Sequence, residues 1–365
     1  MKIALVHPKF DRSGGAEQYA SALARGLVAL GHEVHLFGRR AEGLAPGVAF
    51  HPIRCLPWGR ALKTWTFARA ARRRVEGRTF DVVQGFGKTT VQTVHRTGGG
   101  VHRAYLEREG RRRPTPYDRV VLRIEDKLFS SSRLRAVIAP SVWVLREIER
   151  FYPAAASLVH VIPNGVDTAV FCPDGRERDR GRLAGRLGLP AAAAVLLFVA
   201  TNFPLKGLDW ALGLLALLPE AHLVVAGGDD QGPFRRQAEA LGADGRLHFL
   251  GRVDDVGPLY CAADLLVHPT RYDPFANVCL EALASGTPVL TTERNGAADV
   301  LSDPRAGAVL EVDAPVEQGA FAARSLLRAG PAGREAARAV ALRCDQAQHV
   351  RAVEALYRAV AGAPA

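Results

Sequence analysis

The strongest constraint on the fold is an alternation along the whole chain: short aliphatic or β-branched runs take turns with helical patterns. KIALVH (2–7), EVHLFG (33–38), VLLFVAT (195–201) and LLVHPT (265–270) are typical of buried strands. This order predicts parallel sheets joined by crossover helices, with enough strands in each half for its own doubly wound domain. Further strands are predicted at 48–53, 81–86, 91–95, 136–141, 158–164, 222–228, 247–251, 288–292 and 308–312.

A change of composition marks the boundary between the two domains. After residue 164 the segment NGVDTAVFCPDGRERDRGR combines Asn-Gly, Pro and a run of charges that interrupts the pattern. We therefore predict an N-terminal domain over residues 1–168 and a C-terminal domain over 169–345. Residues 333–360 carry a long amphipathic pattern that predicts a helix.

The positive charge is concentrated in the first half. Residues 1–170 contain 28 Lys and Arg against 14 Asp and Glu, whereas the rest contains 20 against 23. The densest runs lie at 68–78 and 107–119. Two interpretations stay open: solvated faces of an arginine-rich chain, or the footprint of an anionic surface or acceptor. Nucleic acid is disfavoured, because the runs lack interleaved aromatic residues and the sequence has no nucleic-acid-binding motif.

Cysteine spacing and hydropathy narrow the compartment. Five widely spaced cysteines without a CxxC pair indicate a reducing compartment and no cysteine-based metal site. The longest apolar runs are about ten residues, well short of the roughly 18 that span a bilayer. The start, MKIALVHPKF, predicts a first strand rather than a signal peptide. We expect a cytoplasmic protein, at most peripheral on the inner face of the cytoplasmic membrane.

Loops after strand ends are candidates for chemistry, because ligands of open parallel sheets bind beyond the carboxyl ends of the strands. The first such loop has Gly14-Gly15 before a helix predicted from about residue 16, where backbone N–H groups favour an anion. It is not a GxGxxG fingerprint, which disfavours a dinucleotide. Lys206 follows another strand and precedes Gly207, a position suited to phosphate. The alternatives are a plain strand-to-helix turn and a solvated lysine.

The stretch RYDPFANVCLEALASGTPVL (271–290) places two acids around a core-like segment. Asp273 precedes a helix predicted from Asn277, and Glu281 lies about one turn inside that helix. A folded-back loop would make the two carboxylates neighbours across a pocket. Carboxylates accept hydrogen bonds from vicinal hydroxyls and a helix N-terminus attracts phosphate, so the segment predicts a sugar phosphate site. The alternative is an Asp-Pro turn and a Glu favoured by the helix dipole.

Taken together, these segments resemble the retaining glycosyltransferases of family 4, and among them the lipopolysaccharide core glucosyltransferase I group. GGAEQY, IAPS, IPNGVD, the Lys-Gly pair, AGG and HPTRYDPFANVCLEALASGTPVLTT occur in the family's order over nearly the whole chain. The resemblance implies the α/β GT-B fold: two Rossmann-like, doubly wound parallel-sheet domains facing across a cleft. The final helix, about 346–365, would pack back on the N-terminal domain.

The resemblance also implies that the C-terminal domain binds a nucleotide-sugar donor. Glu281 would hydrogen-bond the donor ribose, Asp273 would face the donor sugar, and Lys206 would neutralise the leaving diphosphate. The remaining donor contacts implied by position are Gly14, Gly15, Arg252, Val253, Phe275, Ala276, Asn277 and Val278.

The N-terminal domain would bind the acceptor. His95 matches the position of a histidine near the transferred sugar, His102 is a second candidate, and Arg96 lies beside them in the sequence. The catalytic candidates are then Lys206, Asp273 and His95.

Three positions depart from the family pattern. Thr201 stands where the family usually has an arginine, so Arg96 or Arg271 would have to replace that cation. Ala276 replaces a glycine, which narrows the approach of backbone to sugar. Asp273 is one methylene shorter than the family's Glu, a change that affects donor selectivity, loosens the site or leaves the chain inactive.

The predicted activity is retaining transfer of a hexose without a metal or cofactor. The donor is a nucleoside-diphosphate sugar, most simply UDP-glucose, and the acceptor is lipid-linked or a saccharide such as lipopolysaccharide core. The basic first half fits an anionic membrane surface. The alternatives are a nucleotide-sugar 2-epimerase of the same fold, a non-catalytic nucleotide-sugar-binding protein, and an NADP dehydrogenase, which the missing GxGxxG disfavours.

Overall fold

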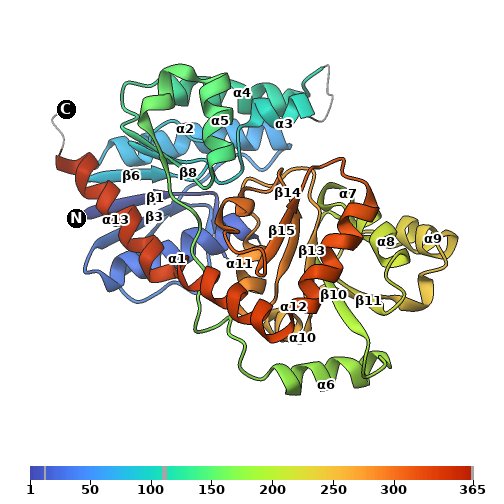
Figure 1. Cartoon of the computed structure of the whole chain (residues 1–365). Helices are drawn as coiled ribbons and strands as arrows, with labels where there is room; N and C mark the ends of the chain where they lie inside the picture. The colour runs from blue at the N-terminus through green and yellow to red at the C-terminus, as the bar shows by residue number, and fades with distance from the viewer. Residues whose placement is uncertain (12–13, 109–112, 363–365) are drawn as a thin grey trace. The chain divides into compact units, whose positions relative to one another are not determined.

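The computed structural model describes residues 1–11, 14–108 and 113–362, so residues 109–112 of the basic run at 107–119 lie outside the described residues. The described chain forms two compact α/β units (Figure 1). Unit 1 contains Met1–Pro163 and the chain from Ala347 onward, and unit 2 contains Asn164–Gln346. The observed division therefore falls after Pro163, against the predicted 168.

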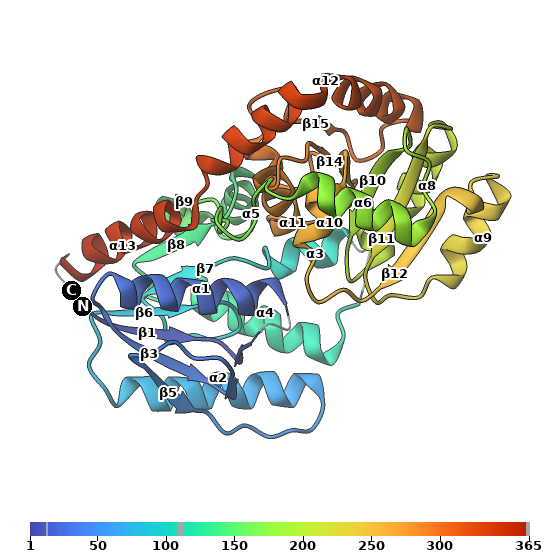
Figure 2. The same cartoon turned by 90° about the horizontal axis from the view of Figure 1, so that it is seen from below.

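Unit 1 is built on a parallel sheet of seven strands in the order β5-β3-β1-β6-β7-β8-β9. Helices α1 (Gly15–Ala29) and α13 (Gln346–Gly362) cover one face, and α2 (Arg60–Glu76) covers the other (Figure 2). The strands are β1 (Lys2–Val6), β3 (Glu33–Gly38), β5 (Val48–Pro52), β6 (Val82–Gly85), β7 (Val94–Arg96), β8 (Ala136–Ala139) and β9 (Val159–Val161). The other elements are a small parallel pair, β2 (Lys9–Phe10) and β4 (Arg40–Ala41), with α3 (His102–Arg108), α4 (Pro116–Phe129), α5 (Val142–Phe151) and η1 (Pro153–Leu158).

Helix α13 is part of the core of unit 1. Its Val353 and Tyr357 are fully buried in one cluster with α1. A methyl group at Gly26 of α1 would come within 2.6 Å of Val350 Cγ2, so only glycine permits the two helices to approach this closely. The Tyr357 hydroxyl donates to Gln84 Oε1 of β6 at 2.6 Å, which fixes the helix to the sheet.

The prediction of a single helix over residues 333–360 is wrong in one respect, because the structure has two helices there with a break between them. Helix α12 ends at Leu342 and α13 begins at Gln346. The Cys344 carbonyl accepts from Val166 N at 2.9 Å, and Gln346 N donates to Val166 O at 2.9 Å. These hydrogen bonds come from a segment far away in the sequence and replace the intrahelical bonds at this point.

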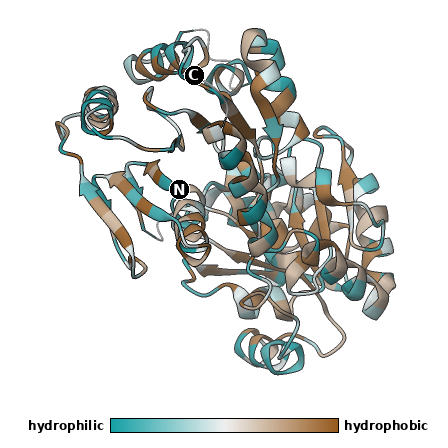
Figure 3. Ribbon diagram, turned by 90° about the vertical axis from the view of Figure 1, so that its left-hand side faces the viewer, coloured by the Kyte–Doolittle hydropathy of each residue, from teal (hydrophilic) through white to brown (hydrophobic). Residues whose placement is uncertain are grey.

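Unit 2 is built on a second parallel sheet, of six strands in the order β12-β11-β10-β13-β14-β15. Its four central strands are largely buried, as expected for parallel strands that are covered on both faces, and Figure 3 shows brown, apolar residues along many strands of the chain. The strands of this sheet are β10 (Ala194–Val199), β11 (Ala221–Ala226), β12 (Leu247–Gly251), β13 (Leu265–His268), β14 (Val289–Thr292) and β15 (Gly307–Leu310). The helices are α6 (Arg176–Leu187), α7 (Phe203–Lys206), α8 (Leu208–Ala216), α9 (Gly232–Ala240), α10 (Gly257–Ala262), α11 (Asn277–Ala284) and α12 (Val316–Leu342), with the short turns η2 (Asp244–Arg246) and η3 (Gly296–Val300).

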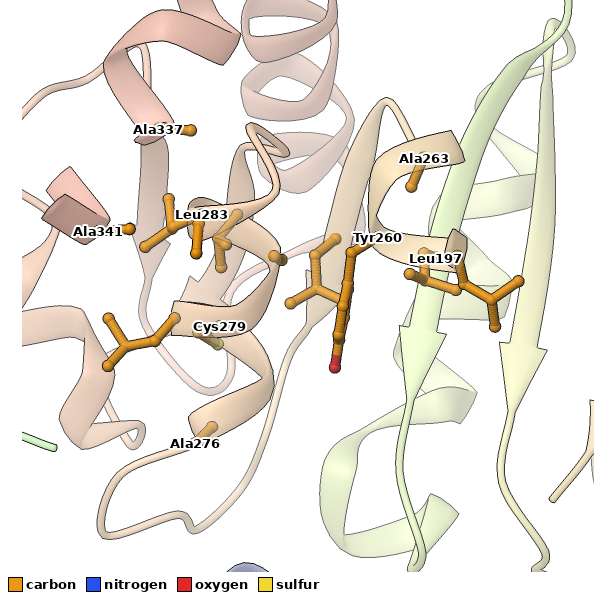
Figure 4. Packing of buried hydrophobic residues seen from close by; sticks show 14 of the residues in the cluster. Leu197, Tyr260, Ala263, Ala276, Cys279, Leu283, Ala337 and Ala341 are labelled. Atoms are coloured by element: carbon orange, nitrogen blue, oxygen red, sulfur yellow. The ribbon is translucent and has the colours of Figure 1, made fainter. Parts of the chain in front are cut away.

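Two hydrophobic clusters flank this sheet. On one face, α6, α10, α11 and the second half of α12 pack together, with Tyr260, Cys279, Leu283 and Ala337 among the buried side chains (Figure 4). On the other face lie α8, α9 and the first half of α12. Helix α12 serves both clusters because it kinks at Gly330 (φ 51°), just before Pro331. In both sheets the strand order reverses once, at β1/β6 and at β10/β13, which is where doubly wound folds bind ligands.

Candidate active site

Lys206 is positioned by the loop after β10. Asn202 caps the single turn of α7 by accepting a hydrogen bond from Leu205 N at 3.0 Å. Gly207 then adopts the left-handed conformation (φ 79°), and a methyl group there would lie 2.2 Å from the Pro269 carbonyl oxygen. Only glycine therefore lets the loop after β10 pack on the loop after β13. The contact between Gly207 and Pro269 brings Lys206 close to Asp273.

Lys206 and Asp273 form an ion pair at this reversal point. Lys206 Nζ lies 2.6 Å from Asp273 Oδ2 and donates a second hydrogen bond to the Tyr272 carbonyl at 3.2 Å. The two charged side chains are 18% and 16% exposed. Burial by itself would raise the pKa of Asp273, but Lys206 and the nearby His268 together outweigh it and lower that pKa to about 2. Asp273 is therefore an anion at neutral pH, with Lys206 as its counterion.

The backbone around Asp273 is fixed by the loop after β14. Asp273 N donates to Arg294 O and Gly296 N donates to Asp273 O, both at 2.9 Å. The buried side chain of Asn295 accepts from Ala276 N at 3.1 Å. The sequence analysis missed Asn295, and the Asn-Gly pair just after β14 is the signal that could have pointed to it. These bonds tie the loop that contains Asp273 to the loop after β14.

Helix α11 begins at Asn277, as predicted, with Ala276 as its N-cap residue and no side-chain cap among the described residues. Phe275 and Ala276 are buried, whereas Asn277 and Val278 are partly exposed. The Asn277 side-chain oxygen accepts a hydrogen bond from Asn164 Nδ2 at 2.7 Å. The first turn of α11 therefore has no capping side chain among the described residues, an arrangement that suits an anion.

Glu281 has a different partner from Asp273. Its Oε2 accepts from the hydroxyl of Tyr260 at 2.8 Å, and Tyr260 is buried in the cluster of Figure 4. Burial raises the pKa of Glu281, and the Tyr260 hydrogen bond partly offsets this effect. The predicted contact of both acids with one ligand stays a prediction.

His268 belongs to this cluster and was missed by the sequence analysis. It is the last residue of β13 and its Nε2 lies 3.7 Å from Asp273 Oδ2. Its residue exposure is 1%, and within the described residues neither ring nitrogen has a hydrogen-bond partner. A histidine in the buried run LLVHPT, directly before the loop, is the signal that could have identified it.

Three other predicted donor-side residues lie on loops of unit 2. Arg252 is exposed and Val253 half-buried directly after β12, beside the loop after β11, where Gly227 N donates to Gly251 O at 2.8 Å. Arg271, one candidate for the cation missing at Thr201, makes a bidentate ion pair with Asp209 (2.6 and 3.0 Å).

In unit 1, Gly14 and Gly15 lie at the start of α1. Gly14 is the N-cap residue and is extended (φ −168°), so its backbone conformation does not require glycine. A methyl group at Gly14 would lie 2.7 Å from Glu17 Oε2, which is the end of a flexible side chain that can move aside. The carboxylate of Glu17 thus occupies the first turn, next to the amides predicted to hold the diphosphate.

The predicted acceptor-side residues of unit 1 have partners inside the unit. Burial lowers the pKa of His95 to about 3, and its Nδ1 lies 3.3 Å from Gln92 Nε2. The guanidinium carbon of Arg96 lies 3.5 Å from the centre of the Tyr19 ring. His102 Nε2 lies 3.0 Å from Asp118 Oδ1. Arg96 and His95 are buried, so the structure places these side chains in the interior of unit 1.

Residues 1–11, 14–108 and 113–362 contain no group of three or more His, Cys, Asp or Glu side chains arranged to hold a metal ion. Over the same residues, no helix combines the length and the apolar character that crossing a membrane requires.

Comparisons with known proteins assign the family. The family described as Glycosyltransferase Family 4 matches residues 13–170, and the family described as Glycosyl transferases group 1 matches residues 179–339. A probable transglycosylase of Burkholderia thailandensis is 31% identical over 83% of this chain and 80% of its own length. The lipopolysaccharide glucosyltransferase WaaG of Escherichia coli is 33% identical over 46% of each chain.

Solved structures agree on the fold. A crystal structure of WaaG, a glycosyltransferase involved in lipopolysaccharide biosynthesis, matches with a TM-score of 0.83 and 24% identity over 99% of this chain and 100% of its own. The structure of HepE from Anabaena with UDP-glucose matches with a TM-score of 0.76 and 18% identity over 98% of this chain and 100% of its own. With its two parallel-sheet units and its sequence relatives, the chain belongs to the group 1 and family 4 glycosyltransferases and has the GT-B fold.

Proposed function

We propose that this chain is a retaining, metal-independent glycosyltransferase that moves a hexose, with glucose favoured, from a UDP-sugar to a lipid-linked or saccharide acceptor such as lipopolysaccharide core. The observation that carries the proposal is the Lys206–Asp273 pair, which lies beside the N-terminus of α11 where the strand order of unit 2 reverses. A cation and uncapped backbone amides suit a diphosphate, and a carboxylate suits sugar hydroxyls.

The chemistry assigned to these residues is stabilisation of the leaving diphosphate. Lys206 and the amides of Asn277 and Val278 carry the developing negative charge, and Gly14 and Gly15 add further amides. The acceptor hydroxyl attacks from the face that the diphosphate leaves, and a phosphate oxygen takes its proton. No side chain acts as the base. Glu281 holds the ribose, and His95 lies on the side of the transferred sugar.

A donor panel tests this proposal. Thermal unfolding is followed with UDP-, GDP- and ADP-glucose, and we expect UDP-glucose to raise the midpoint most, because a ligand that binds only the folded state stabilises it. Labelled UDP-glucose and a lipopolysaccharide core acceptor should then give a product of retained anomeric configuration, with or without EDTA. If no donor shifts the midpoint, donor binding is contradicted. An epimer formed without acceptor would indicate the epimerase. Donor binding without transfer or hydrolysis would indicate a non-catalytic protein.

An exposed apolar and basic surface of unit 1 supports the proposal that the acceptor lies at an anionic membrane. Leu56, Trp58, Leu62 and Trp65 are exposed, and Trp58 is 75% exposed. They lie on α2 and the segment before it, next to the basic run at 68–78. Exposed tryptophans among arginines are typical of a helix that lies in a bilayer interface, where the rings insert and the cations meet anionic headgroups.

Co-sedimentation with vesicles tests the membrane surface. We expect binding to vesicles with anionic phospholipid and much weaker binding to purely zwitterionic vesicles. A double Trp58→Ala, Trp65→Ala variant should lose most of this binding, whereas Phe321→Ala, which removes an exposed aromatic residue of unit 2, should not. Equal binding to both kinds of vesicle would contradict the proposal.

A further inference from the structure

The side chain of His268 is a buried polar group outside the ion pair of Lys206 and Asp273. It is buried at the end of β13, and within the described residues both ring nitrogens lack a hydrogen-bond partner. An unsatisfied buried polar atom costs roughly 1–3 kcal/mol. The backbone carbonyl of His268 is engaged, since it accepts from Thr291 Oγ1 at 2.8 Å, and the ring lies 6.4 Å from that of Phe198. Within the described residues, the two ring nitrogens are the atoms of His268 that lack a hydrogen bond.

The nearby acceptor is already occupied. Asp273 Oδ2 lies 2.6 Å from Lys206 Nζ and 3.7 Å from His268 Nε2, and the second distance is too long for a hydrogen bond. The other oxygen, Oδ1, accepts from Phe275 N at 3.1 Å. Lys206 and His268 therefore compete for one carboxylate oxygen, and in the free protein Lys206 holds it.

Donor binding changes this balance. If Lys206 is to stabilise a diphosphate, its ammonium must turn from Asp273 towards the phosphate oxygens. Asp273, only 16% exposed, then loses a charge-assisted hydrogen bond in a place where water cannot fully replace it. The His268 Nε2–H group is within 1 Å of hydrogen-bond range of the same oxygen.

We propose that His268 is a positioning residue that takes over the hydrogen bond to Asp273 Oδ2 when Lys206 turns to the diphosphate of the donor. While Lys206 holds this oxygen, His268 Nε2 stays 3.7 Å from it, and the oxygen becomes available to His268 once Lys206 turns away. Burial lowers its pKa, so the ring is neutral and can donate through one nitrogen without a change of charge. This inference rests on the proposed function, since it requires a diphosphate at Lys206.

The first test is His268→Phe, which keeps a ring of similar size and removes both nitrogens. Binding of UDP-glucose is measured by calorimetry, and the thermal midpoint is measured without ligand. We expect an equal or higher midpoint, because two unsatisfied atoms disappear, and donor affinity lowered by about ten- to a hundredfold, as for loss of a hydrogen bond to a charged group. His268→Gln, which restores an N–H donor, should recover part of the affinity.

A double-mutant cycle separates this role from a structural one. In a Lys206→Ala background Asp273 has no lysine to lose, so His268→Phe should change donor affinity by less than about twofold. An equal loss of affinity in both backgrounds would overturn the exchange of partners, as would wild-type affinity in the single His268→Phe variant. If the wild-type protein binds no nucleoside-diphosphate sugar, the proposed function fails and this inference fails with it.

Discussion

The two units share a strand plan but differ in what they place near the reversal point of the sheet. In unit 2, Lys206 and Asp273 are partly exposed, oppositely charged and paired with each other, and His268 Nε2 lies 3.7 Å from Asp273 Oδ2. In unit 1, His95 and Arg96 are buried and packed against residues of the same unit. The same strand plan therefore carries a partly exposed ion pair in unit 2 and buried side chains in unit 1.

The largest effect on turnover is expected when the Lys206–Asp273 ion pair of unit 2 is broken. Lys206→Ala should lower turnover by about a hundred- to a thousandfold, the range seen when one donor to a developing oxyanion is removed. The matched control is Arg271→Ala, which breaks the exposed Arg271–Asp209 pair of the same loop region and should leave turnover within about twofold. Near-normal transfer in Lys206→Ala would contradict its role, and a large loss in Arg271→Ala would make Arg271 the missing phosphate cation.

The next effect concerns the dependence of stability on pH. The pKa of Asp273 lies at about 2 in the folded protein, below its ordinary value of 3.8. A lowered carboxyl pKa gives stability that is present above pH 4 and lost as the pH falls towards 2, about 2 kcal/mol in all. Thermal midpoints of wild type and Asp273→Asn should therefore differ at pH 6 and converge near pH 2. A constant difference over that range would show that the ion pair is not the cause.

His95 sharpens the comparison from unit 1. Because its pKa is lowered to about 3, it is neutral throughout the working range and should not appear in the pH dependence of turnover between pH 5 and 8. His95→Phe removes the contact with Gln92 and should cost about 1 kcal/mol of stability, with a smaller loss of turnover than Lys206→Ala. If His95→Phe lost as much turnover as Lys206→Ala at unchanged stability, His95 would be a catalytic group. The two units would then no longer differ in this respect.

The smallest effect is expected at the start of α1. Glu17→Gln removes the carboxylate that lies beside Gly14, so donor affinity should rise a few-fold if the amides there hold a diphosphate. Loss of favourable interaction with the helix dipole should cost only about 0.3–1 kcal/mol of stability. Unchanged affinity in equilibrium binding would mean that the diphosphate does not reach this helix terminus.

The strands were predictable because parallel strands that are buried on both faces consist of continuous runs of apolar residues. The start of α11 was also predictable, since Asp-Pro and a buried apolar helix face mark it locally. The Lys206–Asp273 pair was not, because it joins residues far apart in the sequence through the contact of Gly207 with Pro269. His268 was not predicted either, although it directly precedes the loop in the run LLVHPT, because its approach to Asp273 is made by the fold.

The packing of α13 on α1 makes the two units unequal during synthesis. Unit 2 is one continuous segment, Asn164–Gln346, and can complete its core as soon as that segment has left the ribosome. Unit 1 cannot, because Val353 and Tyr357 fill the face of its sheet and are translated after the whole of unit 2. Until then the apolar side of α1 around Gly26 is uncovered, so unit 1, whose strands are translated first, completes its core last.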